Sequence, residues 1–219
     1  MGDFELIAGK RVLFVMATDA EYGPHLRKLF RPLMTGVGPI EAALAMGQAC
    51  ASMKQSGGLP DVVVSLGSAG SRRCALGEVY QVSTVSWRDM DASRIGFPKG
   101  VTPFLGQPAE ISLSTPLRLE TARLSTGANI VGGEAFAAID ADMVDMETYA
   151  VARACQGFGL SLIGLRGISD GPGEIDGITG WTDLLPLLDQ RLAEAVNLLP
   201  EALMQVEDAP HQPAVRTSF

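Results

Sequence analysis

The sequence predicts an α/β fold, a three-layer αβα sandwich in which a central mixed, mainly parallel sheet is covered by helices on both faces. Two observations lead to this prediction. Short apolar runs alternate with helical stretches along most of the 219 residues, a pattern typical of strand, helix and strand units. One of these runs, DVVVSL at residues 61–66, is almost entirely apolar, as expected of a strand that is buried on both faces.

The elements are expected in a regular order. A strand at residues 11–17 precedes a stretch of helical character at 19–30, and a short strand near 33–35 precedes a helix from about 40 to 54 that starts after Pro39. Further strands are expected at residues 61–66, 79–86, 126–131, 143–145 and 160–169, and further helices at 135–139, 147–157 and 181–204. The glycine-rich residues 67–71 are expected to form a loop, and residues 94–111 a longer excursion at a surface or subunit contact.

Length and composition favour one domain. We assign residues 1–206 to a single domain and expect residues 207–219, which lack hydrophobic periodicity, to be poorly ordered. The net charge of -8 and the sequence pI near 4.8 provide no basic surface for a phosphate backbone, so nucleic acid is not an expected partner. No apolar run reaches the roughly 18 to 20 residues of a membrane span, and the first ten residues do not resemble a signal peptide. We therefore expect no membrane association and a cytoplasmic location.

Neither a metal nor a cofactor is expected. The three cysteines, Cys50, Cys74 and Cys155, are widely spaced and form no CxxC pair, so they are interpreted as reduced thiols of the core. The two histidines, His25 and His211, fall in no recurrent ligand spacing with a cysteine or a carboxylate.

Acidic residues follow three of the expected strands. Glu21 lies in MATDAEYG, Glu147 in VDMETYA and Asp170 in RGISDGPGE. Each has an ordinary structural interpretation, because acidic residues favour helix N-termini and Asp before Gly favours turns. Ligands of open α/β sheets, however, bind outside the carboxyl ends of the strands. Three carboxylates at three such ends therefore indicate a chemical site.

Six segments carry a resemblance to a known family. In chain order they are GVGPIEAALA, SLGSAGS, SWRDMDAS, GEAF, VDMETYA and RGISDGPGE. They resemble the successive signatures of the nucleoside phosphorylase/nucleosidase superfamily, and the similarity, which covers about residues 11–203, is nearest to the 5'-methylthioadenosine/S-adenosylhomocysteine nucleosidases. The resemblance implies hydrolysis of the N-glycosidic bond of a purine nucleoside with release of adenine. It also implies a homodimer in which Ile95 and Phe97 complete the 5' pocket of the neighbouring subunit.

The resemblance assigns roles to individual residues. Glu21 would activate the attacking water, Asp170 would donate a proton to the purine N7, and Glu147 would bind the ribose hydroxyls. The other implied substrate contacts are Met146 under the ribose, Phe136 of GEAF stacked on the base, Val37, Ser68, Ser169 and Trp181. These residue types fit the chemistry, because a purine leaves poorly as an anion and a general acid at N7 assists its departure.

Departures from the family's pattern leave the preferred substrate open. Trp87, Arg88 and Met90 replace residues that many nucleosidases fill with Tyr, His and Ala, and Trp181 replaces the usual Phe. The chain is also short between residues 30 and 36, where typical relatives carry a β-hairpin.

Several activities remain as alternatives. Phosphorylases of the superfamily place a phosphate-binding arginine where this chain has Ser65, which favours hydrolysis over phosphorolysis. Arg72 and Arg73 follow nearby and are interpreted as a solvated pair rather than as phosphate ligands. The alternatives are a futalosine-type hydrolase, a purine nucleoside phosphorylase and a noncatalytic nucleoside-binding module.

Overall fold

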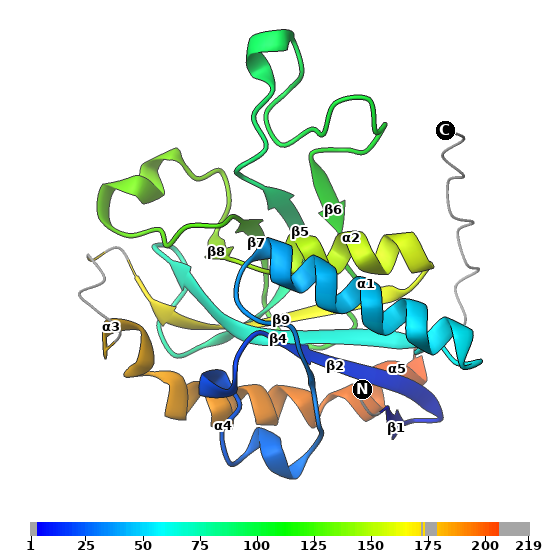
Figure 1. Cartoon of the computed structure of the whole chain (residues 1–219). Coiled ribbons are helices and arrows are strands. Elements are labelled where there is room, and N and C mark those ends of the chain that lie inside the picture. The colour runs from blue at the N-terminus through cyan, green and yellow to red at the C-terminus, as the bar shows by residue number, and fades with distance from the viewer. Residues whose placement is uncertain (1–3, 172, 174–178, 206–219) are drawn as a thin grey trace.

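One mixed sheet forms the centre of the protein (Figure 1). The computed structural model describes residues 4–171, 173 and 179–205, and in these ranges the sheet has nine strands. The strands are β1 (Glu5–Ile7), β2 (Lys10–Met16), β3 (Leu33–Met34), β4 (Val62–Ser71), β5 (Val79–Trp87), β6 (Glu110–Ser112), β7 (Thr121–Thr126), β8 (Met143–Asp145) and β9 (Ser161–Asp170). Parallel pairs join β2 to β3 and β4, β4 to β9, and β7 to β5 and β8. The predicted α/β class is confirmed.

The sheet closes on itself around β4 and β9. β9 runs parallel to β4 along its whole length, and β5 pairs antiparallel with β9. β5 continues through β7 to β8, and β8 returns antiparallel to β4. Gly70 of β4 is therefore in register with Asp170 of β9 on one side and with Val144 of β8 on the other. This closure brings the carboxyl ends of β8 and β9 against the last residues of β4.

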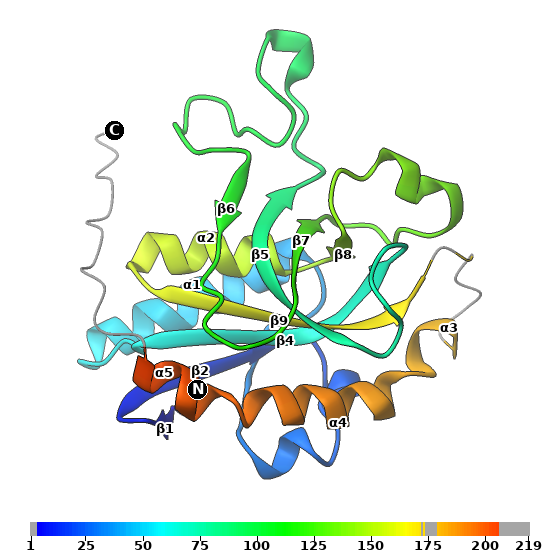
Figure 2. The same ribbon diagram turned by 180° about the vertical axis from the view of Figure 1, so that it is seen from behind.

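Helices cover both faces of the parallel strands (Figures 1 and 2). α1 (Pro39–Gln55) and α2 (Thr148–Phe158) lie on one face, and α4 (Leu185–Val196) and α5 (Leu199–Gln205) lie on the other. Alternate residues of β2 belong to different cores, because Leu13 packs with the α1 and α2 side and Phe14 with the α4 and α5 side. Val63 and Val64 of β4 divide in the same way. The apolar run at residues 61–66 thus is a strand buried on both faces, as predicted.

Two predicted element boundaries are wrong near the site. Residues 67–71 are not a loop, because β4 continues to Ser71 and pairs with β9 throughout. The strand expected at 126–131 is β7, which instead ends at Thr126. Its sequence, TARLST, contains Arg123, whose charge weakens the apolar pattern but is accommodated because the guanidinium lies 2.5 Å from Glu110 and 3.3 Å from Asp140.

The short elements also differ from prediction. Residues 19–30 form two 3-10 helices, η1 (Asp19–Glu21) and η2 (Leu26–Lys28), separated by Gly23 and Pro24, rather than one helical stretch. The predicted helix at 181–204 is divided into α3 (Thr179–Thr182), α4 and α5. Residues 133–138 form a 3-10 helix, η4 (Gly133–Ala138), and strands β1 and β6 were not predicted.

The segment between β5 and β6 projects from the body of the protein, as the excursion predicted at 94–111 requires (Figure 1). It contains a single 3-10 turn, η3 (Ser93–Ile95), and its last residues belong to β6. Ile95 is 69% exposed and Phe104 is 93% exposed, and the ring of Phe104 packs edge to face on Phe97. Within the described ranges, no helix is both long enough and apolar enough to span a bilayer. The predicted tail at 207–219 lies outside the described residues.

Candidate active site

A cavity of about 430 Å³ opens at the carboxyl ends of β2, β4, β8 and β9. Its walls are mostly apolar, but three carboxylates at the ends of three different strands, Glu21, Glu147 and Asp170, line it together with Asp145 of β8. An apolar cavity with a few convergent polar groups is the usual form of a small-molecule site.

Glu21 is held in a buried position at the end of η1. The preceding turn starts at Thr18, whose hydroxyl accepts a hydrogen bond of 3.3 Å from the amide of Ala20. The Glu21 carboxylate accepts two bonds from Ser68 of β4, one from the backbone amide at 2.7 Å and one from the hydroxyl at 2.6 Å. Burial raises the pKa of Glu21, and the two bonds from Ser68 oppose that shift because they stabilise the charged form.

Ser68 has a second hydrogen-bond partner, which comes from α3. The indole N–H of Trp181 in α3 donates a hydrogen bond of 2.9 Å to the Ser68 hydroxyl. Trp181 also lines the cavity. A chain of contacts therefore runs from α3 through β4 to Glu21.

Glu147 stands at the N-terminus of α2, directly after β8. Its carboxylate accepts a hydrogen bond of 2.8 Å from the backbone amide of Gly38, the residue that precedes α1. Burial, followed by the charge of Asp145, raises the pKa of Glu147 to about 7. The Gly-Val-Gly-Pro turn thus serves the site: Gly38 binds the carboxylate, and Val37 lines the cavity.

Asp170 ends β9 in an environment that favours the protonated acid. Its Oδ2 atom accepts a hydrogen bond of 2.7 Å from the hydroxyl of Ser169. Its Oδ1 atom is buried and has no hydrogen-bond partner among the described residues. Burial raises the pKa of Asp170. A Cβ atom on Gly70 would lie 2.5 Å from Oδ1, so only glycine at that position lets the carboxyl group lie against β4.

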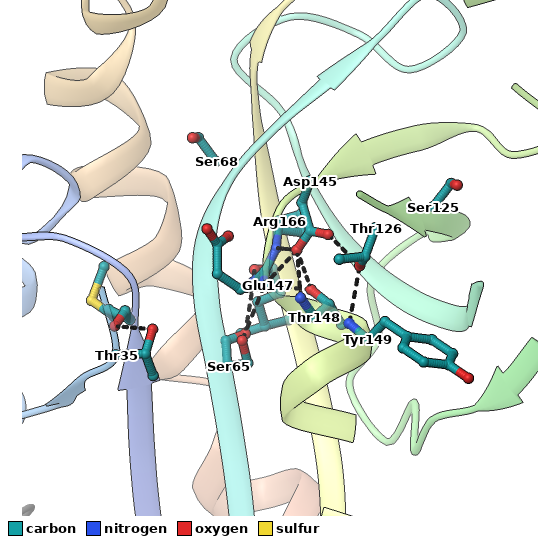
Figure 3. A network of polar contacts seen from close by, with 12 residues as sticks. Thr35, Ser65, Ser68, Ser125, Thr126, Asp145, Glu147, Thr148, Tyr149 and Arg166 are labelled. Carbon is teal, nitrogen blue, oxygen red and sulfur yellow. Dashed lines mark hydrogen bonds and ion pairs between the residues drawn. The ribbon is translucent and has the colours of Figure 1, made fainter. Parts of the chain in front are cut away.

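A buried polar network lies beside Glu147 (Figure 3). The guanidinium of Arg166 on β9 contacts the Asp145 carboxylate at 3.1 Å and donates to the backbone and side-chain oxygens of Ser65 at 3.2 and 3.0 Å. Asp145 also accepts bonds from the hydroxyl of Thr126 at 2.6 Å and from the amide of Thr148 at 3.0 Å. Arg166 and Asp145 are both buried, and their pairing satisfies two charges that burial would otherwise penalise heavily.

Most of the predicted site residues meet in this cavity, and one does not. The residues that line it as predicted are Glu21, Val37, Ser68, Met146, Glu147, Ser169, Asp170 and Trp181. Phe136 is not among the lining residues and instead packs with Val131 and Val144 in a small separate core. The lining residues that follow β7 are Asn129, Ile130 and Val131. The sequence did not indicate these three residues because the strand was predicted to continue to residue 131. The residues expected to follow the strand therefore lay farther along the chain than those that do.

Arg88 is a further lining residue that sequence analysis noted only as a departure. Its guanidinium donates to the backbone oxygens of Ser125, Asp145 and Asn129 at 2.5, 3.0 and 2.6 Å. It therefore ties the ends of β7 and β8 together beside the cavity. Among the described lining residues it is the only lysine, arginine or histidine.

The arginines that follow β4 in the sequence, which were considered as phosphate ligands, lie outside the cavity. Arg73 pairs with Asp142 at 3.0 Å and is about half exposed, and neither Arg72 nor Arg73 lines the cavity. Ser65, at the position of the phosphorylase arginine, accepts a bond from Arg166. In the part of the chain that the structure describes, no group of three histidine, cysteine, aspartate or glutamate residues is placed to hold a metal ion.

Comparison with known proteins identifies the family. The profile of the phosphorylase superfamily matches residues 32–196. This match includes β4, β8, β9 and two of the three carboxylates of the cavity, and the chain belongs to the phosphorylase superfamily.

Similarity to individual relatives is more specific. The chain is 28% identical over 184 residues to the 5'-methylthioadenosine/S-adenosylhomocysteine nucleosidase of Actinobacillus succinogenes, covering 75% of this chain and 77% of the relative. It is 26% identical over 174 residues to the enzyme of the same name from Haemophilus influenzae, covering 71% and 73%.

Solved structures share the fold. The nucleosidase of Colwellia psychrerythraea in complex with adenine superposes with a TM-score of 0.73 at 20% identity, covering 93% of this chain and 97% of the other. The nucleosidase of Neisseria meningitidis in complex with methylthio-immucillin-A gives a TM-score of 0.71 at 19% identity, covering 87% and 98%. A futalosine hydrolase mutant of Helicobacter pylori gives 0.70 at 17% identity, covering 89% and 99%.

Proposed function

We propose that this protein hydrolyses the N-glycosidic bond of a 5'-substituted adenosine, such as 5'-methylthioadenosine or S-adenosylhomocysteine, and releases adenine. The observation that carries the proposal is the convergence of Glu21, Glu147 and Asp170 in one cavity with three different sets of partners. The names of the relatives support the same substrate class.

Asp170 is the proposed general acid. Its carboxyl group lines the cavity, and its Oδ1 atom has no hydrogen-bond partner among the described residues. Because burial raises its pKa, the carboxyl group can keep a proton for donation to N7 of the purine. Ser169 holds the other oxygen in place.

Glu21 is the proposed general base. Two hydrogen bonds from Ser68 to its carboxylate offset part of the cost of burying the charge, so the group can accept a proton from water. The oxygen of that water forms the new bond to C1' of the ribose as the bond to the purine breaks. The products are the free base, protonated at N7 by Asp170, and a sugar with a hydroxyl at C1'.

Glu147 is the proposed ligand of the ribose. An ionised carboxylate accepts hydrogen bonds from two neighbouring hydroxyl groups, and such bonds would lower the pKa of Glu147 from the raised value that burial gives it. Met146, the residue before it, also lines the cavity and is the proposed apolar contact of the sugar. Asn129, Ile130 and Val131 replace Phe136 as the proposed wall beside the base.

Hydrolysis is favoured over phosphorolysis by the charges of the cavity. An inorganic phosphate dianion needs donors and positive charge. Arg88, the only basic residue among the described lining residues, already donates to three backbone oxygens. A futalosine-type hydrolase remains the second candidate, because a futalosine hydrolase shares the fold to nearly the same extent.

Adenine release from a panel of 5'-substituted adenosines, with and without phosphate, tests the proposal. We expect release that does not depend on phosphate. Release that requires phosphate and yields a sugar phosphate would replace hydrolysis with phosphorolysis. Preferential cleavage of futalosine over 5'-methylthioadenosine would establish the second candidate.

A homodimer in the cytoplasm is part of the same proposal. Ile95 and Phe104 are strongly exposed on the projecting segment between β5 and β6, and Phe97 packs on Phe104. Large exposed apolar side chains on one projection are typical of a protein interface. Light scattering at micromolar concentration tests the dimer, and a mass of one chain would contradict it.

The helices on both faces of the sheet support the finer assignment of the fold to the three-layer αβα sandwich.

A further inference from the structure

We infer that Trp181 is a positioning residue that holds the Ser68 hydroxyl in the orientation in which it donates to Glu21. The inference rests on the proposed function, because it concerns the state of the proposed general base. It uses a residue that sequence analysis marked as a departure from the family, where phenylalanine is usual. A phenylalanine ring cannot make the contact described below, because it has no N–H group.

The geometry fixes the direction of the hydrogen bonds. The indole N–H can only donate, so at 2.9 Å from Trp181 the oxygen of Ser68 is the acceptor. A serine hydroxyl has a single hydrogen, and the oxygen of Glu21 lies 2.6 Å away. The serine hydrogen is therefore directed at Glu21, and the chain reads from indole to hydroxyl to carboxylate.

This chain favours the ionised state of Glu21. A protonated Glu21 could still accept from Ser68 through its unprotonated oxygen, but a charged carboxylate accepts such bonds more strongly, so donation from Ser68 stabilises the ionised form. With Glu21 ionised, every member of the chain is satisfied. Accepting a bond from the indole also makes the serine hydroxyl a stronger donor, because linked hydrogen bonds polarise one another.

The other charged groups around Glu21 act in both directions. Arg166 on β9 lowers the pKa of Glu21, and Asp145 on β8 raises it. Glu147 and Asp170 share the cavity with Glu21. Asp19, on the same turn as Glu21, pairs with Arg27 at 3.2 Å. Removal of the indole N–H alters none of these charged groups. A change in the pKa of Glu21 after that removal therefore reports on the bond from Trp181 to Ser68.

The test substitution is Trp181→Phe, which keeps an aromatic ring on the cavity wall and removes the donor. The matched control is Trp87→Phe. The indole nitrogen of Trp87 is buried without a hydrogen-bond partner in the described part of the chain, and its ring packs on Tyr149 outside the cavity. Both variants therefore lose the same atoms, but only one loses a hydrogen bond.

We expect Trp181→Phe to lower kcat/KM about 3- to 10-fold near neutral pH, the size of a typical hydrogen-bond contribution. The acidic limb of the pH profile should move to higher pH by roughly half a unit to one unit, since Glu21 must lose its proton to act. Ser68→Ala should move the limb in the same direction, and adding Trp181→Phe to Ser68→Ala should cause no further shift. An unmoved limb in Trp181→Phe, or additive shifts in the double variant, would overturn the inference.

A second measurement does not depend on turnover. The Trp87→Phe variant has Trp181 as its only tryptophan, so its fluorescence reports on this site. We expect its emission to titrate with Glu21, and the transition to disappear when Glu21→Gln is added but to remain when Asp170→Asn is added. A transition that persists with Glu21→Gln would overturn the inference. An active-site titration without any adenine release would contradict the proposed function and leave the positioning role standing.

Discussion

Replacing Asp170 by asparagine separates acid catalysis from packing. The asparagine side chain has nearly the same shape, and its amide can keep a hydrogen bond with Ser169, which lies 2.7 Å from the present carboxylate. What it lacks is a proton for N7. Loss of a positioned general acid costs about 10²- to 10⁴-fold in rate. The upper part of this range is expected here, because Oδ1 of Asp170 is buried and no other titratable residue follows β9 at this edge of the cavity among the described residues.

The assay is the initial rate of adenine release by Asp170→Asn on the best substrate of the wild type, with thermal unfolding measured on the same preparations. We expect kcat to fall while the unfolding temperature stays the same or rises slightly, because the variant no longer buries a titrating carboxyl group. Binding of adenine should persist. A variant that cleaves its substrate within about threefold of the wild-type rate would refute the assignment of Asp170 as the acid.

Two further predictions concern stability. The pKa of Glu147 is raised from 4.5 to about 7 in the fold, so the folded state holds the proton more tightly and loses stability as the pH rises through that window. Glu147→Gln keeps the oxygen that accepts from Gly38 but does not titrate. The variant should therefore lose about 3 kcal/mol less stability than the wild type between pH 4 and pH 8, measured by urea unfolding at both pH values. An unchanged pH dependence of stability would contradict the raised pKa of Glu147. Arg166→Met leaves the buried Asp145 carboxylate without its cation and should cost about 3 to 5 kcal/mol, whereas Arg118→Met, which breaks an exposed pair with Glu201, should cost less than about 1 kcal/mol. Equal losses in the two arginine variants would contradict this interpretation of the buried network.

Strand positions that depend on apolar runs were predictable. Residues 61–66 and 160–169 are read correctly because strands buried on both faces are mostly apolar at successive positions, and β4 and β9 are such strands. β7 was misplaced because four of its six residues are polar, and Arg123 among them pairs with Glu110, which lies outside the strand. The glycines at 67 and 70 resembled a loop, yet glycine there serves the close approach of carboxylates to an extended strand. No local pattern distinguishes these two uses of glycine.

The three proposed catalytic carboxylates of the cavity were predicted and the lining residues that follow β7 were not, for a related reason. Glu21, Glu147 and Asp170 come from motifs that directly follow correctly located strands. Phe136 was selected as the aromatic member of a motif, but it lies in η4, beyond the residues that directly follow β7. The hydrogen bonds of Trp181 and Arg88 join elements far apart in sequence, and they could be found only after the fold had placed those elements together.

One buried cation acts on two of the three proposed site carboxylates and not on the third. Arg166 lowers the pKa of both Glu21 and Glu147, since its guanidinium lies under that part of the cavity and pairs with Asp145. Burial raises the pKa of Asp170, and only the bond from Ser169 opposes that rise. The donors of Ser68 and the cation thus oppose the rise that burial causes in the pKa of Glu21, whereas Asp170, which is less deeply buried, has only the bond from Ser169 to oppose that rise. In the proposed mechanism this difference in partners lets Glu21 act as the base and Asp170 as the acid in one cavity, and the pairing of β9 with β4 brings Asp170 beside the strand that carries Ser68.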